Sequence, residues 1–104
     1  MLAHLLRAHG FRVITAADGR AGLSAIKRAR PRLVLLDLIM PRMDGFEFLR
    51  KLRELRAGKS LPVVIITGES GVVAPANVPL LNKPIDGDQL VGQIRGILEE
   101  ATVH

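Results

Sequence analysis

The sequence predicts an α/β fold in which helices cover a parallel sheet. Two apolar runs, Leu33–Asp37 and Val63–Thr67, contain no polar residue before the one that ends each of them. Runs that are apolar on both faces are typical of parallel strands with helices on either side. Segments with helical periodicity alternate with these runs, and this alternation indicates a layered α/β domain.

A helix, a strand and a second helix are expected before the first apolar run. Three leucines share one side of a short N-terminal helix, which ends at Gly10. Phe11–Thr15 is predicted to be a strand because it is rich in aromatic and β-branched residues. Asp18–Ala29 has an apolar inward face and is followed by Pro31, so we predict a helix there.

Two helices and one further strand are expected after the first run. Apolar residues recur at helical spacing in Asp44–Ala57, and Gly58 is the predicted stop of that helix. Val78–Leu81 is predicted to be the last strand. The helix Asp86–Glu100 carries a long apolar stripe, and its first residue forms a predicted capping box with Gln89.

The composition excludes several classes of protein. The chain has 104 residues, which fits one domain, and no cysteine, which excludes disulfides and thiolate metal sites. The three histidines lie near the ends without zinc-ligand spacing. No apolar run reaches the ~20 residues of a membrane span, and we expect a soluble, cytoplasmic protein without membrane contact.

The net charge of +5 raises the possibility of a polyanionic partner. Five cationic residues lie inside or just after one predicted helix: Arg50, Lys51, Arg53, Arg56 and Lys59. A solvated helix face is the favoured interpretation, because exposed helices usually carry such charge. The chain has no Trp or Tyr for base stacking, so nucleic acid is the less favoured partner.

Polar residues follow three predicted strands on what should be one edge of the sheet, where ligands bind in such folds. Asp37 and Thr67 end the two apolar runs, and Lys83 follows the last strand. Each has an ordinary alternative: a loop cap, a β-former and a solvated charge. Together, a carboxylate could attack phosphorus while a hydroxyl and an ammonium stabilise the phosphoryl oxygens.

These motifs resemble the receiver domains of two-component response regulators. Leu33 to Gly45 is similar to their phosphoacceptor strand and loop, Thr67-Gly68 to their switch hydroxyl and its small neighbour, and Asn82-Lys83-Pro84 to their lysine-proline motif. The resemblance covers residues 1–104. It implies a flavodoxin-like, doubly wound parallel sheet.

The resemblance also implies a role for each matched residue. Asp37 would be the phosphoacceptor, with Thr67 and Lys83 as its catalytic partners. Asp37 and the backbone carbonyl of Ile39 would face Mg²⁺. The implied structural residues are Pro41, Asp44, Gly45 and Pro84, the last after a cis peptide bond.

The sequence departs from the family pattern in three places. It opens in the first helix, so the usual first strand and its acidic pair are absent, and we expect a domain incomplete at its N-terminus. Mg²⁺ should therefore bind weakly or not at all, and Lys83 should pair with Asp37 directly. Ser70–Asn77 replaces a fourth helix with small residues, and Leu81 replaces an aromatic switch residue.

The expected function is signal relay, with phosphorylation of Asp37 by a histidine kinase or phosphotransfer protein changing the affinity for an unidentified effector. The alternative is a receiver-fold interaction module that works without phosphorylation. An independent enzyme is not expected, because no general base or cofactor loop is visible. The exposed sheet edge left by a missing strand could pair with a second copy of the chain.

Overall fold

The computed structural model describes residues 2–37, 45–68, 71–75 and 77–102. The chain forms two compact units, and each has its own packing. The larger unit is continuous and comprises residues 16–84. The smaller unit combines residues 1–15 with residues 85–104.

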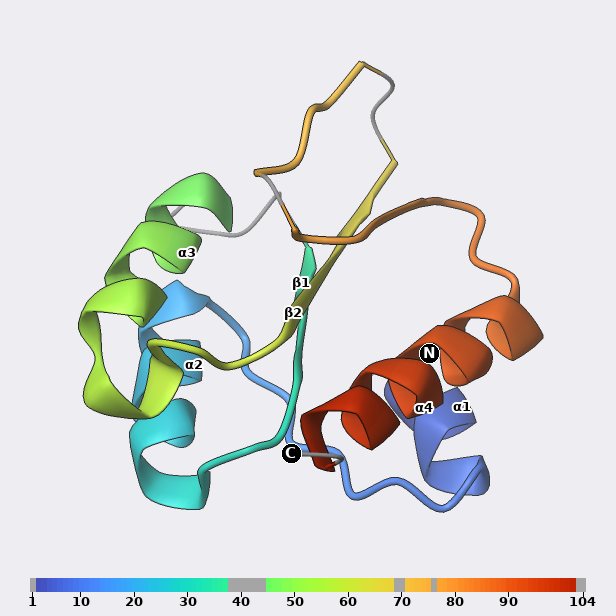
Figure 1. Cartoon of the computed structure of the whole chain (residues 1–104), viewed down its shortest axis with the longest axis horizontal. Coiled ribbons are helices and arrows are strands. Elements are labelled where there is room, and N and C mark those ends of the chain that lie inside the picture. The colour runs from blue at the N-terminus through green and yellow to red at the C-terminus, as the bar shows by residue number, and fades with distance from the viewer. Residues whose placement is uncertain (1, 38–44, 69–70, 76, 103–104) are drawn as a thin grey trace. The chain divides into compact units, whose positions relative to one another are not determined.

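A three-stranded parallel sheet forms the centre of the larger unit (Figure 1). Its strands are β1 (Val34–Asp37), β2 (Val63–Thr67) and β3 (Leu80–Asn82), in the order β1-β2-β3. β2 pairs in parallel with both neighbours. The predicted parallel sheet is therefore confirmed, and both continuous apolar runs form strands.

Two helices lie on one side of this sheet, α2 (Gly19–Ala29) and α3 (Gly45–Glu54) (Figure 1). Ile26 of α2 and Phe48 of α3 belong to the same buried apolar cluster as Leu36 and Ile65 of the sheet. The helices approach closely at Gly22, where an added Cβ would lie 3.0 Å from the Phe48 ring. These contacts bury the apolar stripes that predicted the helices.

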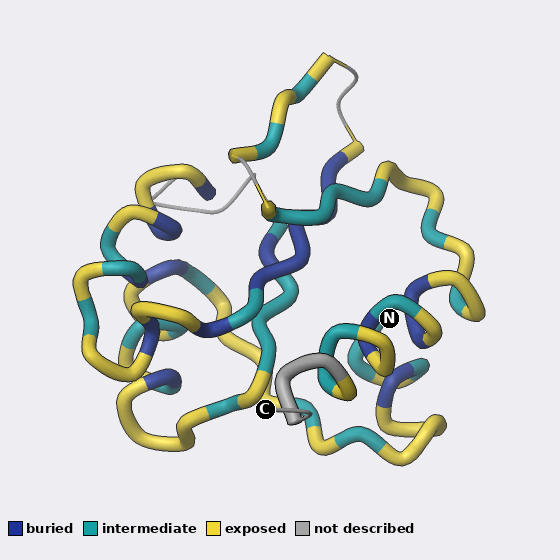
Figure 2. Tube along the Cα trace, in the orientation of Figure 1, coloured by how far each residue is buried: buried dark blue, intermediate teal, exposed yellow. Residues whose placement is uncertain are grey.

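β2 is the most deeply buried element of the larger unit (Figure 2). All five of its residues are buried, and Val64 and Ile65 have no exposed surface. Successive strand side chains point to opposite faces, so both faces of β2 are covered. The residues at its C-terminal end are consequently held in a fixed position.

Side-chain and main-chain caps fix the ends of α2. Asp18 accepts a hydrogen bond from the main-chain N–H of Ala21 at 2.9 Å, which satisfies a helix-end donor. At the other end, Arg30 has a left-handed backbone with φ of 48°, and its N–H donates to the Ile26 carbonyl. The helix therefore has nearly the predicted bounds.

α3 ends earlier than predicted. The helix stops at Glu54, and a 3₁₀ helix, η1 (Arg56–Gly58), replaces its predicted last turn. Leu55 is extended between the two helices. The Arg53 guanidinium donates to the carbonyls of Gly58 at 2.9 Å and Leu61 at 2.7 Å, and these bonds hold the turn beside the helix.

β3 begins two residues later than predicted, at Leu80 instead of Val78. The Val78 N–H donates to the Pro75 carbonyl and closes a turn, and Pro79 has no N–H to donate. The described residues of the preceding stretch, 71–75 and 77, form no helix, as their sequence predicted. Val72, Ala74 and Val78 pack against the core cluster instead.

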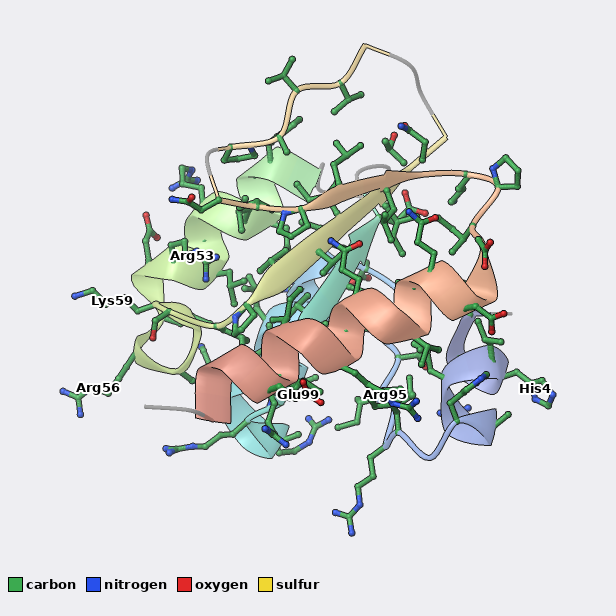
Figure 3. The ribbon with its side chains drawn as sticks, turned by 45° about the vertical axis from the view of Figure 1, so that its right-hand side comes forward. His4, Arg53, Arg56, Lys59, Arg95 and Glu99 are labelled. Carbon is green, nitrogen blue, oxygen red and sulfur yellow. The ribbon has the colours of Figure 1, made fainter. Side chains whose placement is uncertain are left out.

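The smaller unit contains α1 (Leu2–Ala8) and α4 (Gly87–Thr102). An added Cβ at Gly87 would meet the Leu5 side chain at 3.0 Å, so α1 packs against the start of α4. Asp86 caps α4 by accepting hydrogen bonds from the main-chain N–H groups of Asp88 and Gln89. The Arg95 side chain extends from α4 (Figure 3) and lies over the ring of Phe11 at 5.6 Å.

The predicted strand Phe11–Thr15 is wrong, because the segment has no regular structure. Its backbone groups bond elsewhere: the Phe11 N–H donates to the Leu6 carbonyl, and the Val13 carbonyl accepts from the Arg7 side chain. These local bonds take the place of a ladder with another strand. Among the residues that the structure describes, no helix is both long and apolar enough to cross a membrane.

Candidate functional site

The three predicted site residues lie at the C-terminal ends of three neighbouring strands. In the ladders, Asp37 pairs with Ile66, one residue before Thr67, and Thr67 pairs with Asn82, one residue before Lys83. Parallel strands end at the same edge of a sheet, so the ladder register brings these positions together. The sequence prediction of a shared edge is confirmed.

Asp37 and Lys83 form an ion pair across this edge. The Lys83 Nζ donates to the Asp37 Oδ2 at 2.9 Å, although the residues are far apart in the sequence. Each side chain is 46% exposed. A pair this exposed contributes at most about 1 kcal/mol to stability, so both groups remain accessible to a ligand at little cost.

Thr67 is held more rigidly than the charged pair. It is 1% exposed, and its carbonyl accepts a hydrogen bond from the Lys83 main-chain N–H at 2.8 Å. This bond ties the lysine to the end of β2 and so fixes where its side chain starts. The spacing of the motifs gave no sign of this bond, because it depends on the register of β3.

Glycine and proline shape the surroundings of the pair. An added Cβ at Gly68 would meet the Lys83 Cδ at 3.8 Å, so the small residue leaves the lysine stem uncovered. The peptide bond between Lys83 and Pro84 is cis, as the resemblance implied. Gly45 is buried at the start of α3. Ile39, Pro41 and Asp44, the other residues singled out from the sequence, lie outside the described residues.

The described residues do not gather several metal-ligating side chains in one place. No three His, Cys, Asp or Glu side chains in that part of the chain are grouped so that they could hold a metal ion. Asp37 supplies a carboxylate at the strand edge, and Lys83 places a cation beside it. The ammonium is a donor that could bond to the oxygens of an anionic group such as a phosphoryl group.

The sequence matches a family model described as the response regulator receiver domain over residues 1–95. The probable transcriptional regulatory protein TcrX of Mycobacterium tuberculosis is 31% identical over 109 residues, covering 99% of this chain and 46% of TcrX. Protein PilG of Pseudomonas aeruginosa is 32% identical over 97 residues, covering 88% of this chain and 72% of PilG. The chain spans 23% to 46% of the length of the first five curated relatives it matches.

Solved structures show the same fold. Chemotaxis protein CheY4 of Vibrio cholerae is similar with a TM-score of 0.82 and 30% identity, covering 93% of this chain and 86% of that one. The receiver domain of sensor histidine kinase PA1611 from Pseudomonas aeruginosa gives a TM-score of 0.85 at 25% identity, covering 94% and 85%. That structure has a magnesium ion coordinated in its active-site cleft.

Proposed function

Since the chain belongs to the response regulator receiver domain family, we propose that it relays signals by accepting a phosphoryl group on Asp37. The observation that carries this proposal is the ion pair between Asp37 and Lys83 at the end of the parallel strands. It joins a nucleophilic carboxylate to a cation that suits phosphoryl oxygens.

The proposed reaction forms an acyl phosphate. A carboxylate oxygen of Asp37 attacks phosphorus, and the new O–P bond replaces the P–N bond of a phosphohistidine on a histidine kinase or phosphotransfer protein. The leaving imidazole nitrogen takes the electron pair and a proton from solvent. The Lys83 ammonium and the Thr67 hydroxyl would stabilise the phosphoryl oxygens as charge moves onto them.

Mg²⁺ is implied by the family but fits the described residues incompletely. The ion takes about six oxygen ligands and is usually held by one or two carboxylates together with waters and phosphate oxygens. Asp37 is one such carboxylate, and the proposed contribution of the Ile39 carbonyl lies outside the described residues. The chain's own chemistry at this edge therefore rests on Asp37, Lys83 and Thr67, with metal binding expected to be weak.

The proposed output is a change in partner affinity. A phosphoryl group adds up to about two negative charges and new hydrogen-bond acceptors next to Lys83. The phosphoryl oxygens would replace the Asp37 carboxylate as the anionic partner of the ammonium and so alter the surface around β3. Leu81 stands where the family usually has an aromatic residue, and residues 71–75 form no helix. This change would therefore be transmitted by other residues. The downstream effector is unidentified.

The test is phosphorylation by acetyl phosphate, with and without Mg²⁺, followed by intact mass spectrometry. We expect a mass gain of one phosphoryl group that hydroxylamine removes, and no gain in Asp37→Asn, because an amide is a poor nucleophile. Asp18→Asn is the matched control, since it changes a carboxylate of the same unit that caps α2. An unmodified wild-type chain would favour the phosphorylation-independent interaction module instead.

A further inference from the structure

The larger unit has a concentration of positive charge at the end opposite Asp37. It consists of two groups of exposed residues. One group lies in the last turn of α2 or directly after it, and the other lies in or directly after η1, which packs beside α2. We call this surface the basic end and define it as Lys27, Arg28, Arg30, Arg32, Arg56 and Lys59. Figure 3 shows Arg56 and Lys59 extending away from the ribbon.

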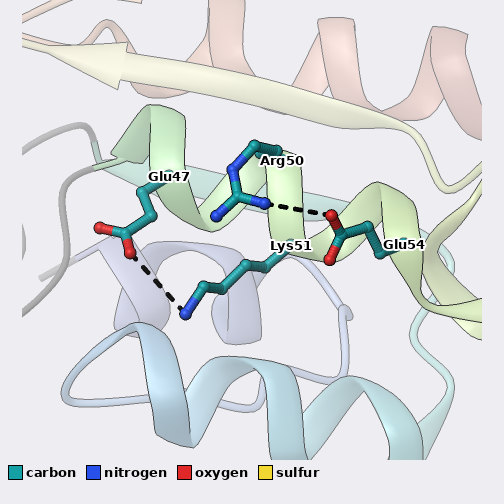
Figure 4. A network of polar contacts seen from close by, with 4 residues as sticks. All are labelled: Glu47, Arg50, Lys51 and Glu54. Carbon is teal, nitrogen blue, oxygen red and sulfur yellow. Dashed lines mark hydrogen bonds and ion pairs between the residues drawn. The ribbon is translucent and has the colours of Figure 1, made fainter.

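The charges of α3 itself are largely neutralised. Arg50 pairs with Glu54 at 3.1 Å, and Lys51 pairs with Glu47 at 3.7 Å (Figure 4). Arg53 donates to two main-chain carbonyls. These contacts support the solvated-face interpretation for the helix. The cationic residues of α3 are for this reason not counted as part of the basic end.

The basic end differs from α3 in the sequence that surrounds it. The ion pairs described for the larger unit join other residues: Arg50 to Glu54, Lys51 to Glu47 and Lys83 to Asp37. The sequence has no Asp or Glu from Gly19 to Leu36, and none from Leu55 to Gly68. The α2 dipole accounts for Lys27 and Arg28, which lie in its last turn. It does not require four more cations nearby, which repel one another unless an anion offsets them.

The composition of the basic end selects the kind of anion. The centres of protein interfaces are depleted of charged residues and enriched in aromatic ones, whereas the basic end consists of six charged side chains. The exposed large apolar residues of the described chain are Ile14, Phe46 and Val73. Phe46 lies at the opposite end of α3, Val73 in the loop after β2, and Ile14 in the other unit.

We propose that the basic end binds the sugar-phosphate backbone of double-stranded nucleic acid without reading base sequence. A duplex offers closely and regularly spaced phosphates and needs no apolar surface for this mode of binding. Four of the six residues are arginines, and each planar guanidinium group can donate two hydrogen bonds to the same phosphate. The proposal does not depend on phosphorylation of Asp37, which lies at the other end of β1.

The test measures binding of the full chain to a fluorescently labelled duplex of random sequence by anisotropy, over a series of salt concentrations. We expect log K to fall with log salt with a slope of about −3 to −5, because each neutralised phosphate contributes about −0.9. The double variant Arg28→Gln/Arg56→Gln should make the slope shallower by about 2.

The matched control is Arg12→Gln/Arg20→Gln, which removes the same charge from exposed positions outside the basic end. Its slope should stay that of the wild type. An equal loss in both double variants would mean that net charge alone attracts the duplex, and would overturn the proposal. Stronger binding to poly-glutamate or to anionic vesicles than to the duplex would also overturn it. Matching circular dichroism spectra will show that both variants are folded.

Discussion

Replacing Arg53 tests whether the turn after α3 is held by the guanidinium group. Arg53→Gln removes two hydrogen bonds from a charged donor to main-chain carbonyls, at 2.9 Å and 2.7 Å, in a partly buried place. Charged hydrogen bonds contribute about 1.5–3 kcal/mol each when fully formed in protein interiors. Partial exposure reduces this, so we expect a loss of about 2–3 kcal/mol in the free energy of unfolding.

Arg50→Gln is the control on the same helix. Its ion pair with Glu54 joins side chains that are 61% and 65% exposed, so its loss should cost about 0.5 kcal/mol or less. Both variants lose one positive charge. In urea unfolding, where m is about 1–3 kcal/mol/M, the midpoint of Arg53→Gln should fall by roughly 1–2 M and that of Arg50→Gln only slightly. Equal midpoints in the two variants would refute the reasoning.

Three further predictions concern Gly58, Asp18 and Lys83. Gly58→Ala would press a methyl group onto the fully buried Leu52 and should lower the free energy of unfolding by about 1–3 kcal/mol. Gly96→Ala is the control, because Gly96 has open space around it in a helix, and this change should raise the stability. Thermal unfolding measures both variants. Asp18→Ala should cost about 1 kcal/mol through loss of the α2 cap, and Asp18→Ser should recover most of it. Lys83→Gln should change stability by less than about 1 kcal/mol yet sharply reduce acyl phosphate formation. Unchanged phosphorylation in that variant would remove the lysine from the proposed mechanism.

The fold was predictable where local sequence and tertiary packing agree. The two continuous apolar runs form β1 and β2. A strand whose two faces are both covered has apolar side chains along its whole length, so this pattern predicts such a strand. Phe11–Thr15 has strand-forming residues but no ladder, since strand propensity does not indicate whether a partner is available. The start of β3 depended on the missing N–H of Pro79, a detail that the apolar pattern did not reveal.

The site was predictable as a set of residues but not as a geometry. Asp37 and Thr67 could be placed at the sheet edge because each ends an apolar run. The ion pair between Asp37 and Lys83 was expected, but its distance depends on the register of β3 against β2. The basic end was harder to predict from the sequence, because its residues come from two separate segments, the end of α2 and the region of η1, which only the fold brings together.

The parallel arrangement of the strands has a consequence for the order in which the chain folds. Val34 pairs with Val63, and Ile65 pairs with Leu80, so each ladder joins residues that are far apart along the chain. Helices need only local contacts, whereas these ladders require long loops to close first. The carboxylate, hydroxyl and ammonium can meet only after both ladders form. During refolding, the helical circular dichroism signal should therefore recover before the chain regains any ability to accept a phosphoryl group.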